Sequence, residues 1–238
     1  MNLTGKTETG RRPHNEDTFF AGVVNGTAIA VVSDGMGGHK AGEVASRIAV
    51  DTVVSALTQS SSGCKPVQAF GLANRAVYDA AEADETKAGM GATLVLALPE
   101  EDRFTAANVG DSRLYLLHER TLRQITHDHS YVAELVRRHI ITAEEAKTHP
   151  RRNVITRAIG TDEIVRTDVF VEDWTEGDTL LLCSDGLSGS LSESEMTYLL
   201  LAEHDLDRAC EKLIERAYQN GSTDNITVVL VRNTEDAQ

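Results

Sequence analysis

The dipeptide Asn25-Gly26 lies between two apolar runs, DTFFAGVV and TAIAVVS, and it is the feature that most restricts the fold. Asn-Gly favours a type I′ turn, because both central residues of that turn need a positive φ. The two runs are therefore predicted to form a β-hairpin in which Asp17 lies directly opposite Asp34. A bulge would shift this register by one residue but would leave both carboxylates at one edge of the sheet.

The other predicted elements do not alternate regularly between strands and helices. Five further segments rich in apolar and β-branched residues are predicted to be strands: ATLVLAL, RFTAANVG, RLYLLH, TLLLCS and NITVVLV. Apolar residues at helical spacing predict four helices: residues 41–57, 66–83, 192–204 and 205–220. Strands that follow one another without a helix between them form antiparallel sheets, whose outer faces the helices cover. The pattern therefore predicts an α+β fold rather than a doubly wound parallel sheet.

Size, charge and cysteine content limit the classes of function. The 238 residues suffice for one domain, and the formal net charge of −14 disfavours nucleic acid and anionic membranes as partners. No apolar run approaches the ~20 residues that span a bilayer, and the N-terminal stretch has no apolar signal-peptide core. The three cysteines have no C-x-x-C spacing. This usage predicts reduced thiols in a cytoplasmic protein rather than a zinc site or a disulfide framework.

A second pair of acids repeats the arrangement of the first. Asp185 follows the strand TLLLCS and Asp224 precedes the strand NITVVLV, so both are expected at one sheet edge. If the two sheets stack face to face, all four carboxylates converge there. Crowded carboxylates repel one another unless cations lie among them, and ligands that are all oxygen favour Mg²⁺, Mn²⁺ or Ca²⁺. The alternative is that each Asp-Gly is only a turn.

A set of motifs along the chain occurs in the order found in a known family. They are RPHNED, VVSDGMGGHKAGEVAS, GATLVLAL, NVGDSRLYLL, THDHS, HPRRNVITRAIG, LLLCSDGLSG and STDNITVVLV. From about residue 4 to residue 232, the chain resembles the metal-dependent Ser/Thr protein phosphatases of the phosphatase 2C type, in particular their bacterial branch. The resemblance implies a four-layer α/β/β/α sandwich. It also implies a single catalytic domain over residues 1–238, with a small flap subdomain at roughly 131–175.

The resemblance also implies a centre that holds two Mn²⁺ or Mg²⁺ ions. The residues at the family's metal-site positions are Asp17, Asp34, Gly35, Asp128, Asp185 and Asp224. Asp34 is expected to bridge both ions, and the carbonyl oxygen of Gly35 is expected to be a further ligand. Asp128 is expected to join Asp185 at a weaker third metal site.

The family's phosphate-binding arginine matches Arg12, which is expected to grip two oxygens of the substrate phosphate. Arg11 remains an alternative, because Arg12 comes only two residues after Gly10, one fewer than is usual in the family. Glu16, beside the first metal-site carboxylate, is expected to hold metal-bound water.

The general acid has no direct match, since eukaryotic relatives have a histidine where this chain has Met36. His39 is the candidate, and its alternative role is packing or capping of the helix that follows it. His127 and His129 are weaker candidates that are more typical of structural positions. Asp111, within GDSR, is expected to play a structural role between strands.

The implied reaction is metal-dependent hydrolysis of phosphoserine and phosphothreonine in proteins. A metal-bridged hydroxide would attack phosphorus in line while Arg12 clamps the phosphate. The motifs D-x-D-x-T and the P-loop are absent, so no phospho-aspartate route is indicated. The implied partners are phosphoproteins modified by a Ser/Thr kinase, and we expect a monomer.

Two other functions remain open at this stage. A pseudophosphatase would bind metal and phosphoproteins without turnover, and an enzyme of the same fold would act on a small phosphorylated metabolite. Residues 137–157 are locally basic, which favours acidic phosphopeptides as substrates. A basic run of this kind is also typical of a solvated face.

Overall fold

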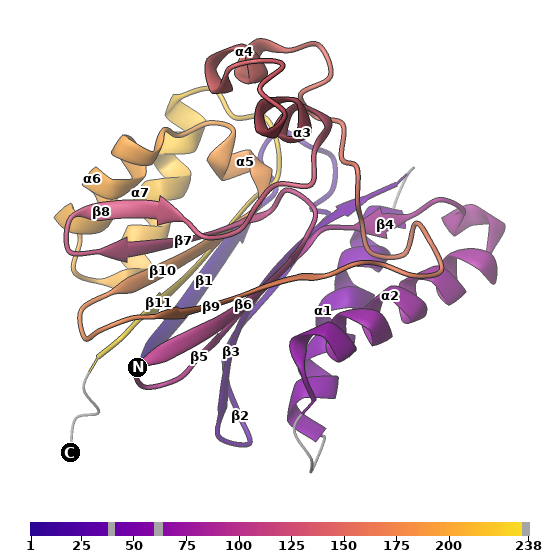
Figure 1. The fold of residues 1–238 in the computed structure, drawn as a ribbon, viewed down its shortest axis with the longest axis horizontal. Coiled ribbons are helices and arrows are strands. Elements are labelled where there is room, and N and C mark those ends of the chain that lie inside the picture. Colours follow the sequence, from indigo (N-terminus) through magenta and orange to yellow (C-terminus); the bar gives the residue numbers. More distant parts are fainter. Residues whose placement is uncertain (38–40, 60–63, 235–238) are drawn as a thin grey trace.

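Two antiparallel sheets lie face to face in the computed structural model, which describes residues 1–37, 41–59 and 64–234 (Figure 1). The first sheet has the order β1 (Asn2–Glu8), β11 (Ile226–Arg232), β10 (Thr179–Cys183), β7 (Arg113–His118) and β8 (Thr121–Gln124). The second has the order β2 (Asp17–Val24), β3 (Thr27–Met36), β5 (Leu94–Pro99), β6 (Arg103–Val109) and β9 (Asp168–Asp173), and the short β4 (Gly91–Ala92) pairs with β3.

The predicted hairpin is present in the predicted register. Asn25 and Gly26 both have positive φ, 51° and 81°, as a type I′ turn requires. The strands pair without a bulge, and Asp17 lies opposite Asp34. The first pair of carboxylates is therefore held side by side by the backbone ladder.

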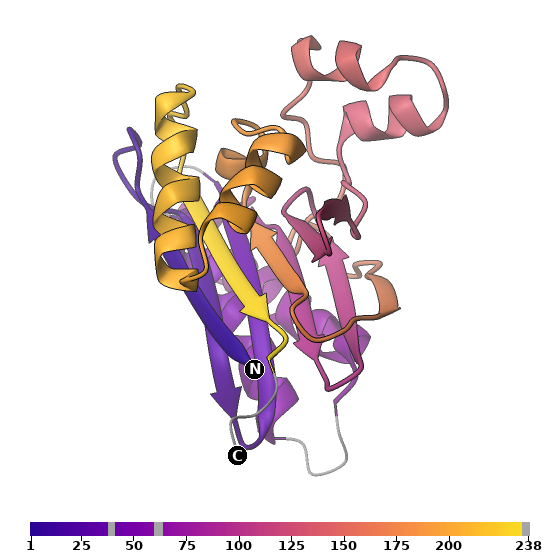
Figure 2. The same ribbon diagram turned by 90° about the vertical axis from the view of Figure 1, so that its left-hand side faces the viewer.

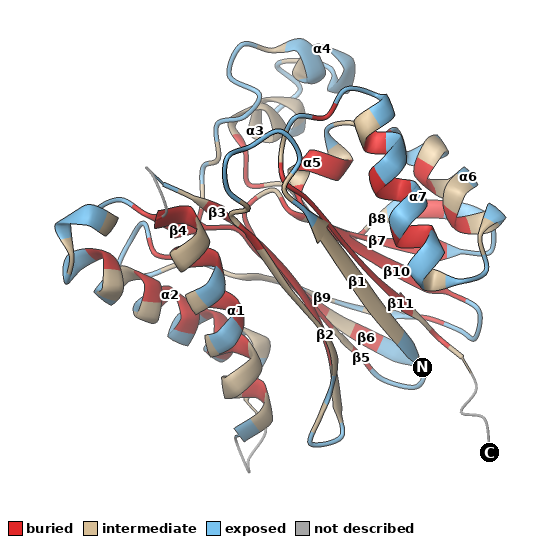
Figure 3. Cartoon of the chain, turned by 180° about the vertical axis from the view of Figure 1, so that it is seen from behind, coloured by how far each residue is buried: buried red, intermediate tan, exposed pale blue. Residues whose placement is uncertain are grey.

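Helices cover the outer face of each sheet, so the expected four-layer α/β/β/α sandwich is confirmed (Figures 1 and 3). The two helices on the second sheet are α1 (Ala41–Gln59) and α2 (Pro66–Glu82), and the two on the first sheet are α6 (Glu193–Ala202) and α7 (Leu206–Gln219). Helix α6 begins where Ser192 Oγ accepts a hydrogen bond from the Glu195 amide, and a positive φ at Gly221 follows the end of α7.

The apolar core forms three layers, one between the sheets and one under each pair of helices. Val32 and Val95 of one sheet are fully buried against Leu182 and Val229 of the other. Burying side chains of this size stabilises the fold by about 1.5–3 kcal/mol each. The layer between the sheets thus fixes how the strand ends of one sheet face those of the other.

Several short elements have no clear signal in the sequence. They are β1, β8, β9, α3 (Tyr131–Arg137), α4 (Ala143–Thr148), α5 (Asp185–Ser188) and the 3₁₀ turn η1 (Glu85–Lys87). β1 is mostly polar, and β9 exposes Val169 and Val171, because both strands lie at or beside sheet edges. Edge strands need little apolar alternation.

The segment expected to form a flap projects beyond the sheets and carries α3 and α4 (Figure 2). The expected range, roughly 131–175, also contains β9, which pairs with β6 along its length. The part outside the sheets therefore ends before residue 168. That residues 1–238 act as one catalytic domain stays a prediction. In the described part of the chain, no helix is both long and apolar enough to cross a bilayer.

Candidate metal centre

Side chains from both sheets meet at one edge of the sandwich. Asp17, at the start of β2, accepts hydrogen bonds at Oδ2 from Ser184 Oγ and Thr227 Oγ1, both at 2.7 Å. Ser184 follows β10 and Thr227 lies in β11, so these bonds join the second sheet to the first. The ionised carboxylates of Asp185 and Asp224 lie near enough to raise the pKa of Asp17. The two predicted pairs of acids are thus brought to one place.

The carboxylates of this cluster are difficult to ionise together. Burial raises the pKa of Asp17 to about 7, against the opposing effect of its two hydroxyl donors. Burial, followed by the charges of Asp17 and Asp185, raises the pKa of Asp34 well above its ordinary value. Burial and the charge of Asp224 raise the pKa of Asp185.

The backbone around Asp34 and Gly35 is tightly fixed. The Asp34 amide donates to Thr93 Oγ1 at 2.9 Å, and the Thr93 amide donates to the Asp34 carbonyl at 2.8 Å. The Gly35 amide donates to the Glu16 carbonyl at 3.0 Å. A Cβ at position 35 would collide with the carbonyl oxygen of Gly42, so only glycine fits there.

Asp185 differs slightly from its expected place at a strand end. β10 ends at Cys183, Ser184 is the N-cap, and Asp185 is the first residue of the short helix α5. The sharp turn is possible because Gly186 packs on the backbone of Asn225, where a Cβ would collide. The carboxylate still lies at the edge where β10 meets β11.

Arg11 and Arg12 are both exposed, but Arg12 contacts this edge. The Arg12 guanidinium pairs with Asp224, with Nη2 at 2.8 Å from Oδ2. The charge of Asp224, followed by those of Asp185 and Glu16, raises the pKa of Arg12. The contacts therefore favour Arg12 over Arg11 as the arginine of the site.

Asp128 is bonded to Arg113, and its expected role at a third metal site stays a prediction. Its Oδ2 lies 2.6 Å from Arg113 Nη2, and its Oδ1 accepts hydrogen bonds from Arg113 Nε and Gln124 Nε2, both at 2.9 Å. Burial, followed by the charges of Asp185 and Asp128, raises the pKa of Asp111 to about 7. The sequence offered a signal for Asp111, since it too follows a buried strand, β6.

The other candidates are placed as follows. His39 lies outside the described residues. His129 is buried: its Nδ1 accepts a hydrogen bond from the Gly110 amide at 3.0 Å, and its Nε2 lies 3.1 Å from Asp168 Oδ2. His127 packs edge-on against Phe170. These contacts are typical of structural histidines.

Glu16 is partly exposed, and its pKa is raised by burial against the opposing charge of Arg12. It lies at the same edge, and its backbone forms hydrogen bonds with residues of both sheets' strand ends. Its amide donates to Asn225 Oδ1 at 2.9 Å, and its carbonyl accepts from the Gly35 amide.

The oxygen atoms of the carboxylate cluster are suited to bind divalent cations. Within the described residues, no three Asp, Glu, His or Cys side chains already form a group that could hold one ion. However, Oδ1 of Asp17 is buried without a hydrogen-bond partner, which is costly for a carboxylate oxygen. The donors are all oxygens, as hard cations prefer. The donor set thus fits such cations, although its side chains do not yet form a closed cage.

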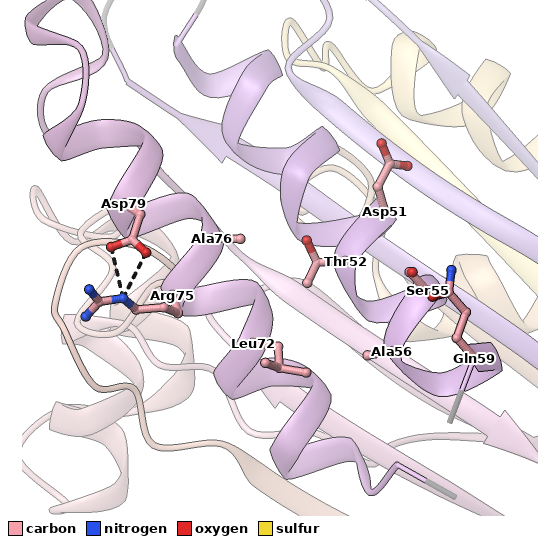
Figure 4. A pocket seen from close by; sticks show the side chains of 9 residues that line it. All are labelled: Asp51, Thr52, Ser55, Ala56, Gln59, Leu72, Arg75, Ala76 and Asp79. Atoms are coloured by element: carbon pink, nitrogen blue, oxygen red, sulfur yellow. Dashed lines mark hydrogen bonds and ion pairs between the residues drawn. The ribbon is translucent and has the colours of Figure 1, made fainter. Parts of the chain in front are cut away.

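A surface hollow lies elsewhere, between α1 and α2 (Figure 4). Its walls include Asp51, Leu72 and the ion pair of Arg75 with Asp79, and none of the clustered carboxylates. It has no group of catalytic side chains, so the edge of the sandwich remains the candidate site.

The family model described as protein phosphatase 2C matches residues 4–230. The chain belongs to the protein phosphatase 2C family. The expectation drawn from the motifs is therefore confirmed, and with it the enzyme class, a protein serine/threonine phosphatase.

Curated and solved members of this family match the chain over nearly its whole length. The serine/threonine phosphatase stp of Listeria welshimeri is 41% identical, over 97% of this chain and 95% of the relative. The structure of the serine/threonine phosphatase Stp1 from Staphylococcus aureus is 37% identical with a TM-score of 0.90, over 97% and 94% of the two chains. A structure of the catalytic domain of the phosphatase PstP in complex with two manganese ions is 34% identical with a TM-score of 0.84, over 96% of each chain.

Proposed function

We propose that this protein phosphatase 2C chain hydrolyses phosphoserine and phosphothreonine in proteins and depends on bound Mn²⁺ or Mg²⁺. The observation that carries the proposal is the convergence of Asp17, Asp34, Asp185 and Asp224, from both sheets, on one edge. The raised pKa values of Asp17, Asp34 and Asp185 mean that a cation would relieve the repulsion among these carboxylates. The manganese ions of the PstP structure support the same choice of metal.

Two cations would be held by Asp34, the carbonyl of Gly35, Asp185 and Asp224, with Asp17 close by. When bound, they would supply the positive charge that activates a water molecule for attack on phosphorus. A third, weaker cation would lie at Asp185. Its second ligand would be Asp128, as the family pattern implies, although Asp128 is also bonded to Arg113. Asp111 is the alternative, because burial and then the charge of Asp185 raise its pKa.

The chain's own residues would bind and orient the substrate. Arg12 lies beside Asp224 and has a planar guanidinium that can donate two parallel hydrogen bonds to phosphate oxygens. Glu16 stands next to it and could accept a hydrogen bond from a water at the site. His39 remains the candidate for the proton donor to the leaving alkoxide.

The projecting segment would receive the protein part of the substrate. Arg151 lies over the ring of Tyr131, 4.1 Å from its centroid, so its charge is presented on a rigid support. Arg152 is exposed beside it. We propose that this basic surface attracts acidic phosphopeptides. A Ser/Thr kinase as the source of the substrates, and a monomeric state, remain predictions.

The proposal is tested by hydrolysis of p-nitrophenyl phosphate and of a phosphothreonine peptide with Mn²⁺, and then after EDTA. We expect turnover of both with the metal and none after chelation. Binding of the phosphopeptide without any turnover would instead identify a pseudophosphatase. Turnover of sugar phosphates but not of the peptide would identify a metabolite phosphatase.

A further inference from the structure

The side chain of Asn225, near the C-terminus, forms hydrogen bonds with the backbone of the loop that carries Arg12. Asn225 Nδ2 donates to the Thr9 carbonyl at 2.8 Å and to the His14 carbonyl at 3.0 Å. Its Oδ1 accepts from the Glu16 amide at 2.9 Å. Asn225 is 5% exposed, so these bonds are shielded from water.

The three hydrogen bonds hold the backbone on both sides of Arg12 in the sequence. Thr9 lies before Arg12, and His14 and Glu16 lie after it, so both arms of the loop are held by the same amide group. A second contact holds the loop against the residue before Asn225, because a Cβ at Gly10 would collide with the carbonyl oxygen of Asp224. Gly10 also has a φ of 65°, which favours glycine.

We propose that Asn225 is a positioning residue that acts through Arg12, holding its guanidinium where the phosphate of the substrate binds. The inference rests on the proposed role of Arg12 as the phosphate ligand. Arginine has a long side chain with many rotamers. A fixed backbone therefore limits the positions that its guanidinium group can reach. A side chain that orients a binding group contributes to catalysis through geometry, since small displacements of such a group cost rate.

Asn74 offers a matched control. It is also a buried asparagine with three backbone partners: Nδ2 donates to the carbonyls of Asp162 and Glu163, and Oδ1 accepts from the Gly160 amide. Asn74→Ala therefore removes the same groups as Asn225→Ala but does not touch the arginine loop. Both variants should unfold at lower temperature than the wild type.

The decisive readout is the Michaelis constant with p-nitrophenyl phosphate at saturating Mn²⁺. We expect Asn225→Ala to raise KM by about tenfold and to lower kcat by less than about threefold, with Asn74→Ala within about twofold of the wild type in both. In the metal-free protein, amides of residues 9–16 should exchange with deuterium faster in Asn225→Ala only. If Asn225→Ala does not fold, Asn225→Asp, which keeps the acceptor oxygen, replaces it.

A double-mutant cycle separates this inference from the proposed function. If Asn225 acts through Arg12, then Asn225→Ala should change KM little in an Arg12→Ala background. Equal effects of Asn225→Ala in both backgrounds, or an unchanged KM, would overturn the inference while leaving the phosphate-binding role of Arg12 intact. If Arg12→Ala itself leaves KM unchanged, the proposed role of Arg12 fails first.

Discussion

The hydroxyl of Ser184 donates a hydrogen bond of 2.7 Å to the carboxylate of Asp17, across the boundary between the two sheets. Both side chains are buried. Ser184→Ala should lower the free energy of unfolding by about 1–2 kcal/mol, because a buried carboxylate loses one of its two donors. Urea unfolding measures this. Ser222→Ala, which removes a buried hydroxyl bonded to the Gly186 carbonyl, is the control for a loss unrelated to Asp17.

Asp185→Asn should reduce the metal-dependent rate by about a hundredfold or more, because it removes a charge that two cations would share. The rate with p-nitrophenyl phosphate and Mn²⁺ measures the effect. Asp178→Asn is a matched substitution at the opposite end of β10, where the carboxylate bonds His118, and it should keep wild-type activity. An unchanged rate in Asp185→Asn with two metals bound would remove Asp185 from the site.

Arg12→Ala should raise KM for phosphate monoesters more than it lowers kcat. Loss of a charge-assisted hydrogen bond worth about 1.5–3 kcal/mol corresponds to about tenfold or more in KM. Arg11→Ala serves as the comparison, because it removes the neighbouring guanidinium without touching the ion pair of Arg12 with Asp224, and it should leave both constants within about twofold. The reverse result would place the phosphate at Arg11.

Asp111 and Asp128 should respond differently to substitution. Asp128→Ala leaves Arg113 without its carboxylate, so the free energy of unfolding should fall by about 1.5–3 kcal/mol. Asp111→Asn breaks no ion pair and should fold normally, but it should raise the Mn²⁺ concentration needed for full activity. Calorimetry and Mn²⁺ titration of both variants decide between the two residues. Altered Mn²⁺ dependence in the Asp128 variant alone would restore Asp128 as the ligand.

Glu195 gives a pH-dependent contribution to stability. Hydrogen bonds from the Ser192 backbone, followed by Asn220, lower its pKa to about 2. A carboxyl with a folded pKa below its unfolded value of about 4.5 stabilises the fold above that value, and the contribution is lost as pH falls towards 2. Glu195→Gln should therefore unfold at lower urea concentration than the wild type at pH 7. The difference in urea midpoint between the two proteins should narrow below about pH 4.5.

The sequence predicted well those features that short-range chemistry determines. The Asn25-Gly26 turn sets the register that places Asp17 opposite Asp34, because turn geometry and strand pairing are local. The four long helices were predicted nearly to their ends for the same reason, because capping residues and apolar spacing are local features of the sequence.

Features that depend on distant packing were not predictable in this way. The polar strand β1 exists because it pairs with β11, more than two hundred residues away. The role of Asp128 was taken from the family pattern. No local sequence signal indicates that Arg113 binds both of its carboxylate oxygens. The three bonds of Asn225 likewise appear only when the two ends of the chain are brought together.

The link between Asp17 and the hydroxyls of the opposite sheet makes the acidic edge a property of the closed sandwich. Neither sheet by itself contains a complete set of acids, and the two sets face each other only after the apolar layer between them has packed. The acidic site therefore forms only when both sheets have folded and packed together. A fragment that ends before β10 would contain Asp17 and Asp34 but lack Asp185 and Asp224, and it would be inactive.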